Sequence, residues 1–432
     1  MFCYFGTLFL YCFSVAMETN VTRGLLNATT GMTGNESIAE TSDSNGRQSF
    51  LIPWNNPHNI MTQKMSDDIT SFLGIYVFPV LTILGIVGNG MSIIVLMQKK
   101  MRDSTTSIVL AGLAFSDMMF LIFNAIRKST AIVERYDQTA ADTFNATTFY
   151  YLFYLKTAFS RVSTMLVVVI STERFIAVLF PFKVKMLVTR TRMTLVVAMA
   201  YVLTLGSLAA LPFQYTYTYI RGKAYISQTA FALKNVDSLK IYNEYFLPIV
   251  FRHIPVVIVL ILNTAIVVSL RRSNQFRHST KDDKRKDEQS KITRTLLTVA
   301  LVFLVCLLPG DALLVCSLVV EGFQFFGLYH NLFLALSDIC LLFEMINACL
   351  NFVIYMVMNK RFYDRAAVLF CGCAKRARSS APSSQDGSQL TTRTSMSTRV
   401  RRALKSYVSS GGSAENREED ISVGADNKTF SP

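Results

Sequence analysis

The sequence lacks the marks of several common protein classes. Tryptophan occurs once, at Trp54, charged residues make up only 17% of the chain, and no cysteine lies between Cys12 and Cys306. No zinc-type spacing is present beyond the lone pair Cys371-Gly-Cys373. A Gly-rich phosphate loop, an HExxH motif and a paired-carboxylate site with a nucleophile are also missing. These absences predict that the protein is not an enzyme and holds no structural metal.

Apolar residues are abundant and occur in long runs. The 432-residue chain is 51% hydrophobic, with a mean hydropathy of +0.35. A helix of about 20 residues crosses about 30 Å of hydrocarbon at 1.5 Å per residue. The pattern therefore predicts an all-α membrane protein, a seven-transmembrane helix bundle over residues 72–358. The predicted spans are 72–97, 107–126, 149–179, 193–212, 246–270, 292–320 and 332–358.

The net charge of +14 comes largely from Lys and Arg in loops beside the spans. This placement favours a lipid bilayer over nucleic acid as the partner of the basic residues. The basic loops follow the first, third and fifth spans, and residues 359–378 add to them. We therefore predict a multi-pass plasma membrane protein with an extracellular N-terminus and a cytosolic C-terminus.

The flanking segments read as non-membrane regions. Residues 1–16 are predicted to be a signal peptide; an uncleaved start is the alternative, because the positive n-region is missing. Residues 17–71 are polar and aperiodic, which predicts a disordered, glycosylated extracellular segment. Residues 379–432 are predicted to be a disordered cytoplasmic tail. The glycosylation sequons begin at Asn20, Asn27, Asn35 and Asn145.

A set of short motifs lies in order along residues 72–375. Glu173-Arg174-Phe175 closes the third span, and Pro255 lies in the fifth. The others are Gly88-Asn89, Leu113-Ala114-Phe115-Ser116-Asp117, Phe303-x-x-Cys306-Leu307-x-Pro309, Asn347-x-x-x-Asn351-Phe352-x-x-Tyr355 and Lys360-Arg361-Phe362. At these spacings the chain resembles rhodopsin-type (class A) G-protein-coupled receptors, and is similar to divergent invertebrate neuropeptide receptors of the FMRFamide type and to chemosensory receptors.

The resemblance implies a polar cluster inside the bundle. Asp117 is a lone carboxylate near the middle of its span and needs partners. The polar residues that could converge on it are Asn89, Ser163, Asn347 and Asn351. In the family this cluster holds a sodium ion, which suits oxygen ligands; a hydrogen-bonded network of waters without sodium is the alternative. No other cofactor or metal is expected.

The resemblance also implies a switch. Arg174 is expected to pair with Glu173 at rest and to be released toward Tyr355 and the G protein on activation. Glu288, at the base of the sixth span, is a candidate second acid for Arg174. Pro309 removes a backbone hydrogen bond and predicts a kink and hinge in the sixth span.

Several positions depart from the family pattern. Leu307 replaces the toggle tryptophan, Phe352 replaces a proline and predicts a straighter seventh span, and Asn263 replaces a tyrosine. Tyr201 is a candidate substitute for the tryptophan of the fourth span. Phe149 stands where the family has a disulfide cysteine, so the second outer loop must be held by its own aromatic residues or be mobile.

The resemblance implies a ligand cavity in the outer half of the bundle, with Lys156 at a ligand-contacting position of the third span, and this region is unusually rich in charged residues. Lys156 precedes Arg174 by five helical turns, so both lie on one face together with Ser160. We expect Lys156 to face a ligand carboxylate, or else to pair internally with Glu344 or Asp311. The other candidate ligand contacts are Arg127, His253, Asp311 and Glu344, and Arg161 and Arg252 add further positive charge.

The cytoplasmic end carries candidate regulatory sites. A short amphipathic eighth helix and palmitoylation at Cys371 and Cys373 are predicted within 359–378. The Ser/Thr-rich tail could accept phosphate from kinase regulators and recruit arrestin-like partners. The predicted function is activation of heterotrimeric G proteins on binding an extracellular ligand, a neuropeptide or a chemosensory small molecule. A polytopic transporter or channel is the alternative, although the chain shows no internal repeat.

Overall fold

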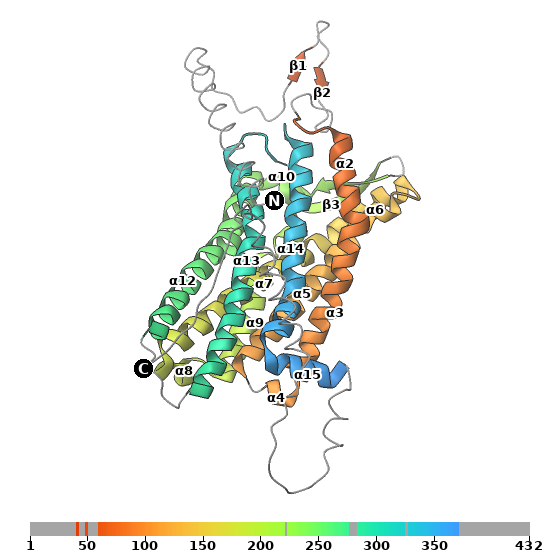
Figure 1. Ribbon diagram of the computed structural model, residues 1–432. Helices are drawn as coiled ribbons and strands as arrows, with labels where there is room; N and C mark the ends of the chain where they lie inside the picture. The colour runs from red at the N-terminus through yellow and green to blue at the C-terminus, as the bar shows by residue number, and fades with distance from the viewer. Residues whose placement is uncertain are drawn as a thin grey trace, which may run out of the picture. The chain divides into compact units, whose positions relative to one another are not determined.

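The computed structural model describes residues 40–42, 48–50, 59–102, 104–220, 223–275, 283–324 and 327–370. In that part of the chain, seven helices are long and apolar enough to cross a membrane. They pack side by side as a bundle (Figure 1), which confirms the predicted seven-helix fold. The spans are Gln63–Leu96, Thr105–Val133, Gln138–Leu179, Arg190–Phe213, Val236–Arg272, Thr293–Val319 and His330–Met358.

The helices that build these spans are named as in Figure 1. The first span joins α2 (Gln63–Phe72), the π-helix η2 (Leu73–Val77) and α3 (Phe78–Leu96), and the second joins α5 (Thr105–Lys128) and α6 (Thr130–Val133). The third span is α7 (Gln138–Leu179), and the fourth joins α9 (Arg190–Ser207) and η3 (Leu211–Phe213). The sixth span lies in α13 (Asp283–Val319), and the seventh is α14 (His330–Met358). The fifth comprises α11 (Val236–Lys240), η4 (Ile241–Phe246), η5 (Ile249–His253) and α12 (Ile254–Gln275). The short helices are α4 (Lys99–Arg102), α8 (Pro181–Leu187), α10 (Ala230–Lys234) and α15 (Lys360–Phe370).

Two helices begin well before the predicted spans, because polar residues cap and extend them. The Thr62 hydroxyl accepts a hydrogen bond from the Met65 amide, so the first span begins at Gln63 rather than near residue 72. The Asp137 carboxylate accepts from the amides of Thr139 and Ala140 and caps α7. The prediction of disorder throughout 17–71 is therefore wrong at its C-terminal end, and two short strands, β1 (Glu40–Ser42) and β2 (Gln48–Phe50), also lie within it.

Close packing at small residues brings the first and seventh spans together. A β-carbon on Gly88 would lie 3.1 Å from Cβ of Phe352, so the large ring lies against the bare backbone of α3. With phenylalanine in place of proline, α14 runs unbroken over 29 residues. The main apolar core includes Val95, Leu166, Phe303 and Tyr355, and it lies toward the end of the bundle where the third span closes on Arg174.

The opposite end carries a hairpin between the fourth and fifth spans. Strands β3 (Tyr215–Ile220) and β4 (Lys223–Gln228) pair antiparallel, with Tyr215 opposite Gln228. We call this end of the bundle the hairpin end. The other end is the Arg174 end, where α15 packs against α3 and α14 across the bottom of the bundle in Figure 1.

Aromatic contacts attach the hairpin to the third span. The Tyr215 ring lies edge-on to Phe149 at 5.3 Å and to Phe153 at 6.4 Å. Tyr217 lies edge-on to Tyr150 at 5.8 Å. Burial raises the pKa of the Tyr215 phenol. Of the two alternatives for this loop, the structure favours attachment by aromatic packing.

Several predicted features lie outside the described residues. They are the signal peptide at 1–16, the sequons at Asn20, Asn27 and Asn35, the cysteines Cys371 and Cys373, and the tail at 379–432. Asn145 is described and is exposed on α7. Helix α15 occupies the predicted position of the amphipathic segment and buries Phe362 and Ala366 against the bundle.

Candidate functional site

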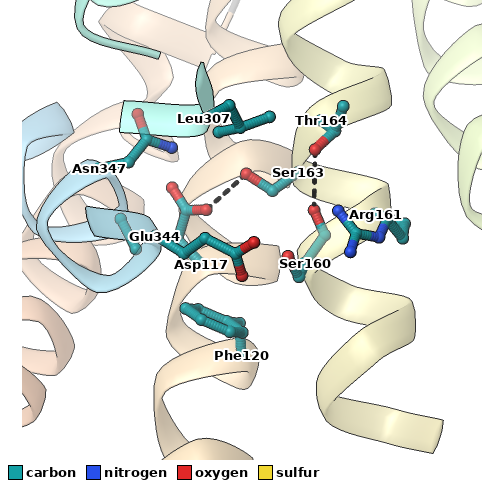
Figure 2. A pocket seen from close by; sticks show the side chains of 10 residues that line it. Asp117, Phe120, Ser160, Arg161, Ser163, Thr164, Leu307, Glu344 and Asn347 are labelled. Carbon is teal, nitrogen blue, oxygen red and sulfur yellow. Dashed lines mark hydrogen bonds between the residues drawn. The ribbon is translucent and has the colours of Figure 1, made fainter. Parts of the chain in front are cut away.

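The centre of the bundle holds a buried carboxylate with two direct partners. Asp117 on α5 is 2% exposed. It accepts a hydrogen bond of 2.6 Å from the Ser163 hydroxyl on α7 and one of 2.7 Å from the Asn351 amide on α14 (Figure 2 draws the first). Two of the four predicted partners therefore contact Asp117, and the contacts tie three spans together.

The other two predicted partners lie differently. The Asn89 amide donates to the backbone oxygens of Gly85 and Ala348, each at 2.9 Å, rather than to Asp117. Asn347 lines a small cavity beside Asp117 without a hydrogen bond to it. Asn89 thus connects the first and seventh spans, and its amide nitrogen does not donate to Asp117.

The cavity beside Asp117 is small. Its volume is about 20 Å³, and Ser160, Arg161, Glu344 and Asn347 are among the residues that line it. That is room for about one water-sized particle. Figure 2 shows Glu344 and Arg161 on opposite sides of it.

The residues present fit a single hard cation. The oxygens of Asp117, Ser163 and Asn347 would hold a sodium ion, whose bound charge would complement the carboxylate. The guanidinium of Arg161 opposes such binding, because it brings a second positive charge to the same cavity. In the described part of the chain, no group of three or more His, Cys, Asp and Glu could hold a metal.

A second buried cluster joins the fifth, sixth and seventh spans. Arg252 in η5 is 5% exposed, and its Nε lies 2.5 Å from Oδ1 of Asp311 on α13. Its Nη1 lies 2.9 Å from Oε1 of Glu344 on α14. His253 is a weaker neighbour, with Nδ1 3.8 Å from Asp311. Arg252 therefore pairs with both acids that are the predicted alternative partners of Lys156.

The same arginine also contacts the sixth span at its proline. Nη2 of Arg252 donates to the backbone oxygen of Leu307 at 3.3 Å. Pro309 lies inside α13 without ending it, and a β-carbon on Gly310 would come within 1.8 Å of the same Nη2. Glycine at this position leaves the space that the guanidinium occupies beside the helix backbone.

The remaining cations near the hairpin end divide into two kinds. Lys128 forms an ion pair with Asp338 on α14, and the Arg127 guanidinium lies over the rings of Phe149 at 5.0 Å and Phe153 at 5.8 Å. Lys156 and Arg161, both half-buried on α7, have no ion pair, hydrogen bond or cation–π contact among the described residues. The alternative in which Lys156 pairs with Glu344 or Asp311 is therefore not the arrangement observed.

The Arg174 end contains a second charged cluster. Arg174 Nη2 lies 2.9 Å from Oε1 of Glu173, and the same nitrogen donates to the Thr106 hydroxyl. Thr105 and Thr106 donate to Oε1 of Glu173 at 2.9 and 2.8 Å. The predicted Glu173–Arg174 pair is therefore present and is tied to α5. Oε2 of Glu173 and Nε of Arg174 are buried without a hydrogen bond among the described residues.

The other predicted switch residues lie apart from Arg174. Tyr355 is 2% exposed, its hydroxyl has no hydrogen bond within the described part of the chain, and its ring packs 5.7 Å from that of Phe362. Glu288 falls within α13, but its side chain is outside the described residues. In the described part of the chain no hydrogen bond joins Tyr355 to Arg174.

Tyr201 and Asn263, two positions that depart from the family pattern, each bond a neighbouring helix. The Tyr201 hydroxyl lies 2.6 Å from that of Ser116 and donates to the Gly112 oxygen at 2.8 Å, so α9 is bonded to α5. The Asn263 amide donates to the Ser171 hydroxyl at 3.1 Å and so connects α12 with α7.

Sequence reasoning missed two features of these clusters. Thr105 and Thr106 carry no motif that marks them as partners of Glu173. Nothing in the pattern selects Arg252 over Lys156 or Arg161 as the cation for two acids far away in the chain. The best sequence signal for the Arg252 cluster was Gly310. A glycine beside a proline inside an apolar helix marks a position where another group approaches the helix backbone closely.

The comparisons with known proteins agree with this architecture. The family described as 7 transmembrane receptor (rhodopsin family) matches residues 88–355. Galanin receptor 2a of Danio rerio is 23% identical over 305 residues, which cover 70% of this chain and 78% of that protein. The galanin-like G-protein coupled receptor npr-9 of Caenorhabditis elegans is 25% identical over 342 residues, covering 70% and 75%. The allatostatin-A receptor of Bombyx mori is 23% identical over 293 residues, covering 66% and 76%.

The match extends over more than half of the chain, from the first span to the last. The fold and the comparisons together define a multi-pass membrane protein of the receptor class. The chain belongs to the rhodopsin family of seven-transmembrane receptors, and is a G-protein-coupled receptor similar to invertebrate members of that family.

Proposed function

We propose that this receptor binds an extracellular ligand at its hairpin end and activates heterotrimeric G proteins at its Arg174 end. The orientation follows from the basic loops, which would place the N-terminus outside and the Arg174 end in the cytosol of a cell with this receptor in its plasma membrane. The N-terminal segment and Asn145 would then be available for glycosylation.

The observation that best supports the proposal is the closed cluster around Arg174. Three hydrogen bonds to the hydroxyls of Thr105 and Thr106 hold Glu173 and Arg174 against α5. The Tyr355 hydroxyl lies buried without a partner among the described residues. A buried hydroxyl without a partner is unfavourable. Release of Arg174 toward Tyr355 would supply one, and would open the base of the bundle to a G protein.

A peptide is the ligand class that the comparisons favour. Two of the relatives carry galanin in their names and a third carries allatostatin-A. The FMRFamide-type resemblance and the chemosensory alternative both remain predictions. A small acidic molecule is the form of the chemosensory alternative that the unpaired cations near the hairpin end favour.

Regulation would follow the family pattern on the cytosolic side. Palmitate on Cys371 and Cys373 would anchor the end of α15 to the inner leaflet. Phosphate on the Ser/Thr-rich tail would recruit arrestin-like partners.

The test is basal nucleotide exchange, because it needs no ligand. The receptor is purified in nanodiscs and mixed with each class of heterotrimeric G protein. Glu173→Gln removes the charge that holds Arg174, so we expect it to raise basal exchange. A hydrogen bond to a charged group contributes about 1.5–3 kcal/mol, enough for about a tenfold or larger shift in the resting equilibrium.

Two further variants complete the test. Arg174→Ala is expected to abolish coupling, and Glu134→Gln, an exposed acid near the hairpin end, is the matched control and should leave exchange unchanged. The proposal is refuted if neither the wild type nor Glu173→Gln promotes exchange on any heterotrimer that a control receptor activates.

A further inference from the structure

A large groove lies on the outer surface of the bundle, beside α12. Its volume is about 730 Å³, and α12 runs along the edge of the bundle in Figure 1. Leu179, five residues after Arg174 on α7, contributes to its wall, so the groove lies at the Arg174 end. We call it the α12 groove. Its aliphatic lining comes from Leu179, Leu260, Ile261, Ala265 and Val268, and its single charge comes from Arg272.

The groove follows one face of α12. Leu260, Thr264, Val268 and Arg272 all line it and recur every four residues, and side chains at that spacing lie above one another on an α-helix. Leu260 and Val268 are 54% and 43% exposed, whereas Ile266, two residues from Val268 on the opposite face, is fully buried. The groove therefore faces away from the core of the bundle and toward the membrane.

The chemistry of this face is that of hydrocarbon with one charge at its end. The Thr264 hydroxyl donates to the backbone oxygen of Leu260 at 2.7 Å, so this donor is satisfied within the helix. Arg272 is exposed, and in the described part of the chain no acid lies within ion-pair distance of it. No acid lines the groove either. The matching occupant is apolar along most of its length and negative at one end.

The length of the groove matches one leaflet of a bilayer. Leu260 and Arg272 are twelve residues apart, which is about 18 Å along the helix axis at about 1.5 Å per residue. Half of the hydrocarbon core of a bilayer is about 15 Å thick. An arginine at the end of a span extends its head group toward the membrane surface. Arg272 therefore lies at the depth of lipid phosphates, and Leu260 lies near the middle of the membrane.

We propose that the α12 groove binds an anionic glycerophospholipid of the leaflet at the Arg174 end. The guanidinium of Arg272 binds the phosphate, which it can do through two parallel hydrogen bonds, and one acyl chain lies along Val268, Thr264 and Leu260. A zwitterionic lipid is bound less well, because its own cation already neutralises its phosphate. The site is separate from the ligand cavity and from the Arg174 cluster.

The test uses tryptophan fluorescence, because Trp54 is the only tryptophan in the chain. The full-length receptor carries Trp54→Phe and Val268→Trp and is placed in nanodiscs of phosphatidylcholine. Phosphatidylserine or phosphatidylcholine with brominated acyl chains, which quench tryptophan on contact, is then added in increasing proportion. We expect brominated phosphatidylserine to quench at an about fivefold lower mole fraction, the ratio that corresponds to about 1 kcal/mol for one arginine at a membrane surface.

Matched variants separate this site from the general attraction of basic residues to anionic lipids. Arg272→Met should abolish the preference for phosphatidylserine, and Arg271→Met, at the neighbouring exposed arginine that does not line the groove, should keep it. Leu260→Trp, at the other end of the groove, is a second reporter and should show the same preference. Leu84→Trp, at a position of α3 that is 61% exposed, should be quenched equally by the two lipids.

Three results would overturn the proposal. Equal quenching by the two lipids at both groove reporters would leave only a non-selective lipid contact. A preference that survives Arg272→Met, or that falls equally in Arg271→Met, would assign it to the general surface charge. Absence of quenching by either lipid would show that protein covers the groove. Both leaflets of a nanodisc hold the same lipids and no G protein is present, so none of these results depends on the proposed receptor function.

Discussion

The clearest energetic prediction concerns Arg252, the cation that joins the fifth, sixth and seventh spans. Arg252→Met keeps an unbranched side chain but leaves Asp311 and Glu344 without their ion pairs of 2.5 and 2.9 Å. Breaking a buried pair by removing one partner costs about 3–5 kcal/mol. At about 2–4 °C per kcal/mol, the scaling for domains of 150–250 residues, Tm should fall by about 6–20 °C.

The assay is thermal unfolding of the ligand-free receptor in nanodiscs. Arg271→Met, the same substitution at an exposed position of the same span, is the control and should leave Tm within about a degree, as surface changes do. The triple variant Arg252→Met, Asp311→Asn, Glu344→Gln removes all three charges. It should recover most of the loss, because a neutral replacement of a buried ion cluster is often neutral or stabilising.

A glycine substitution tests the same cluster without removing a charge. Gly310→Ala would place a methyl group within 1.8 Å of Arg252 Nη2 and push the guanidinium away from its three partners. A β-carbon added at Gly206 would meet no atom within 4 Å, so Gly206→Ala should stabilise the helix by about 1 kcal/mol. The two substitutions should therefore have opposite signs, and a stabilising Gly310→Ala, or a triple variant no better than Arg252→Met, would refute the reasoning.

Three other predictions concern separate parts of the bundle. Sodium chloride should raise Tm more than choline chloride does. Asp117→Asn should abolish that difference between the two salts, and Arg161→Gln should enlarge it. A difference that survives Asp117→Asn would exclude a sodium site at Asp117. Tyr201→Phe should destabilise by about 1 kcal/mol in thermal unfolding, because the hydroxyl bonds of 2.6 and 2.8 Å to Ser116 and Gly112 are lost, whereas Tyr136→Phe, at an exposed tyrosine, should not. Phe149→Ala should speed hydrogen exchange in residues 215–220 and 223–228 relative to Tyr136→Ala, at an exposed tyrosine, and equal protection in the two variants would contradict the role given to Phe149.

The sequence was sufficient to predict the fold because hydrophobic runs and basic loops are properties of the chain alone. It also located the pair Glu173–Arg174, since the two residues are neighbours, and it placed Ser163 and Asn351 near Asp117 by family resemblance. The helix ends were less accurate. Capping by Thr62 and Asp137 extends helices into polar sequence, where hydropathy gives no signal.

The choice of ion-pair partners could not be made from the sequence. Three cations, Lys156, Arg161 and Arg252, were compatible with the two acids that Arg252 binds. The choice depends on how three helices rotate and pack, and on the space beside Gly310, which no spacing within one helix determines. The composition of the cavity was predictable, but the pairing that leaves two cations unpaired was not.

The same packing explains how the hairpin is held without a disulfide. With no cysteine between Cys12 and Cys306, Phe149 instead contacts Phe153 at 4.8 Å, Tyr215 at 5.3 Å and the Arg127 guanidinium at 5.0 Å. The rings that join the hairpin to α7 are Tyr215 with Phe149 and Phe153, and Tyr217 with Tyr150. At about 0.5–1.5 kcal/mol for each pair, the three pairs together are comparable to the about 2–5 kcal/mol typical of a disulfide. Contacts of this kind break and re-form singly, whereas a covalent bond does not. Because no thiol or disulfide takes part in these ring contacts, the attachment of the hairpin to α7 should be insensitive to reducing agents.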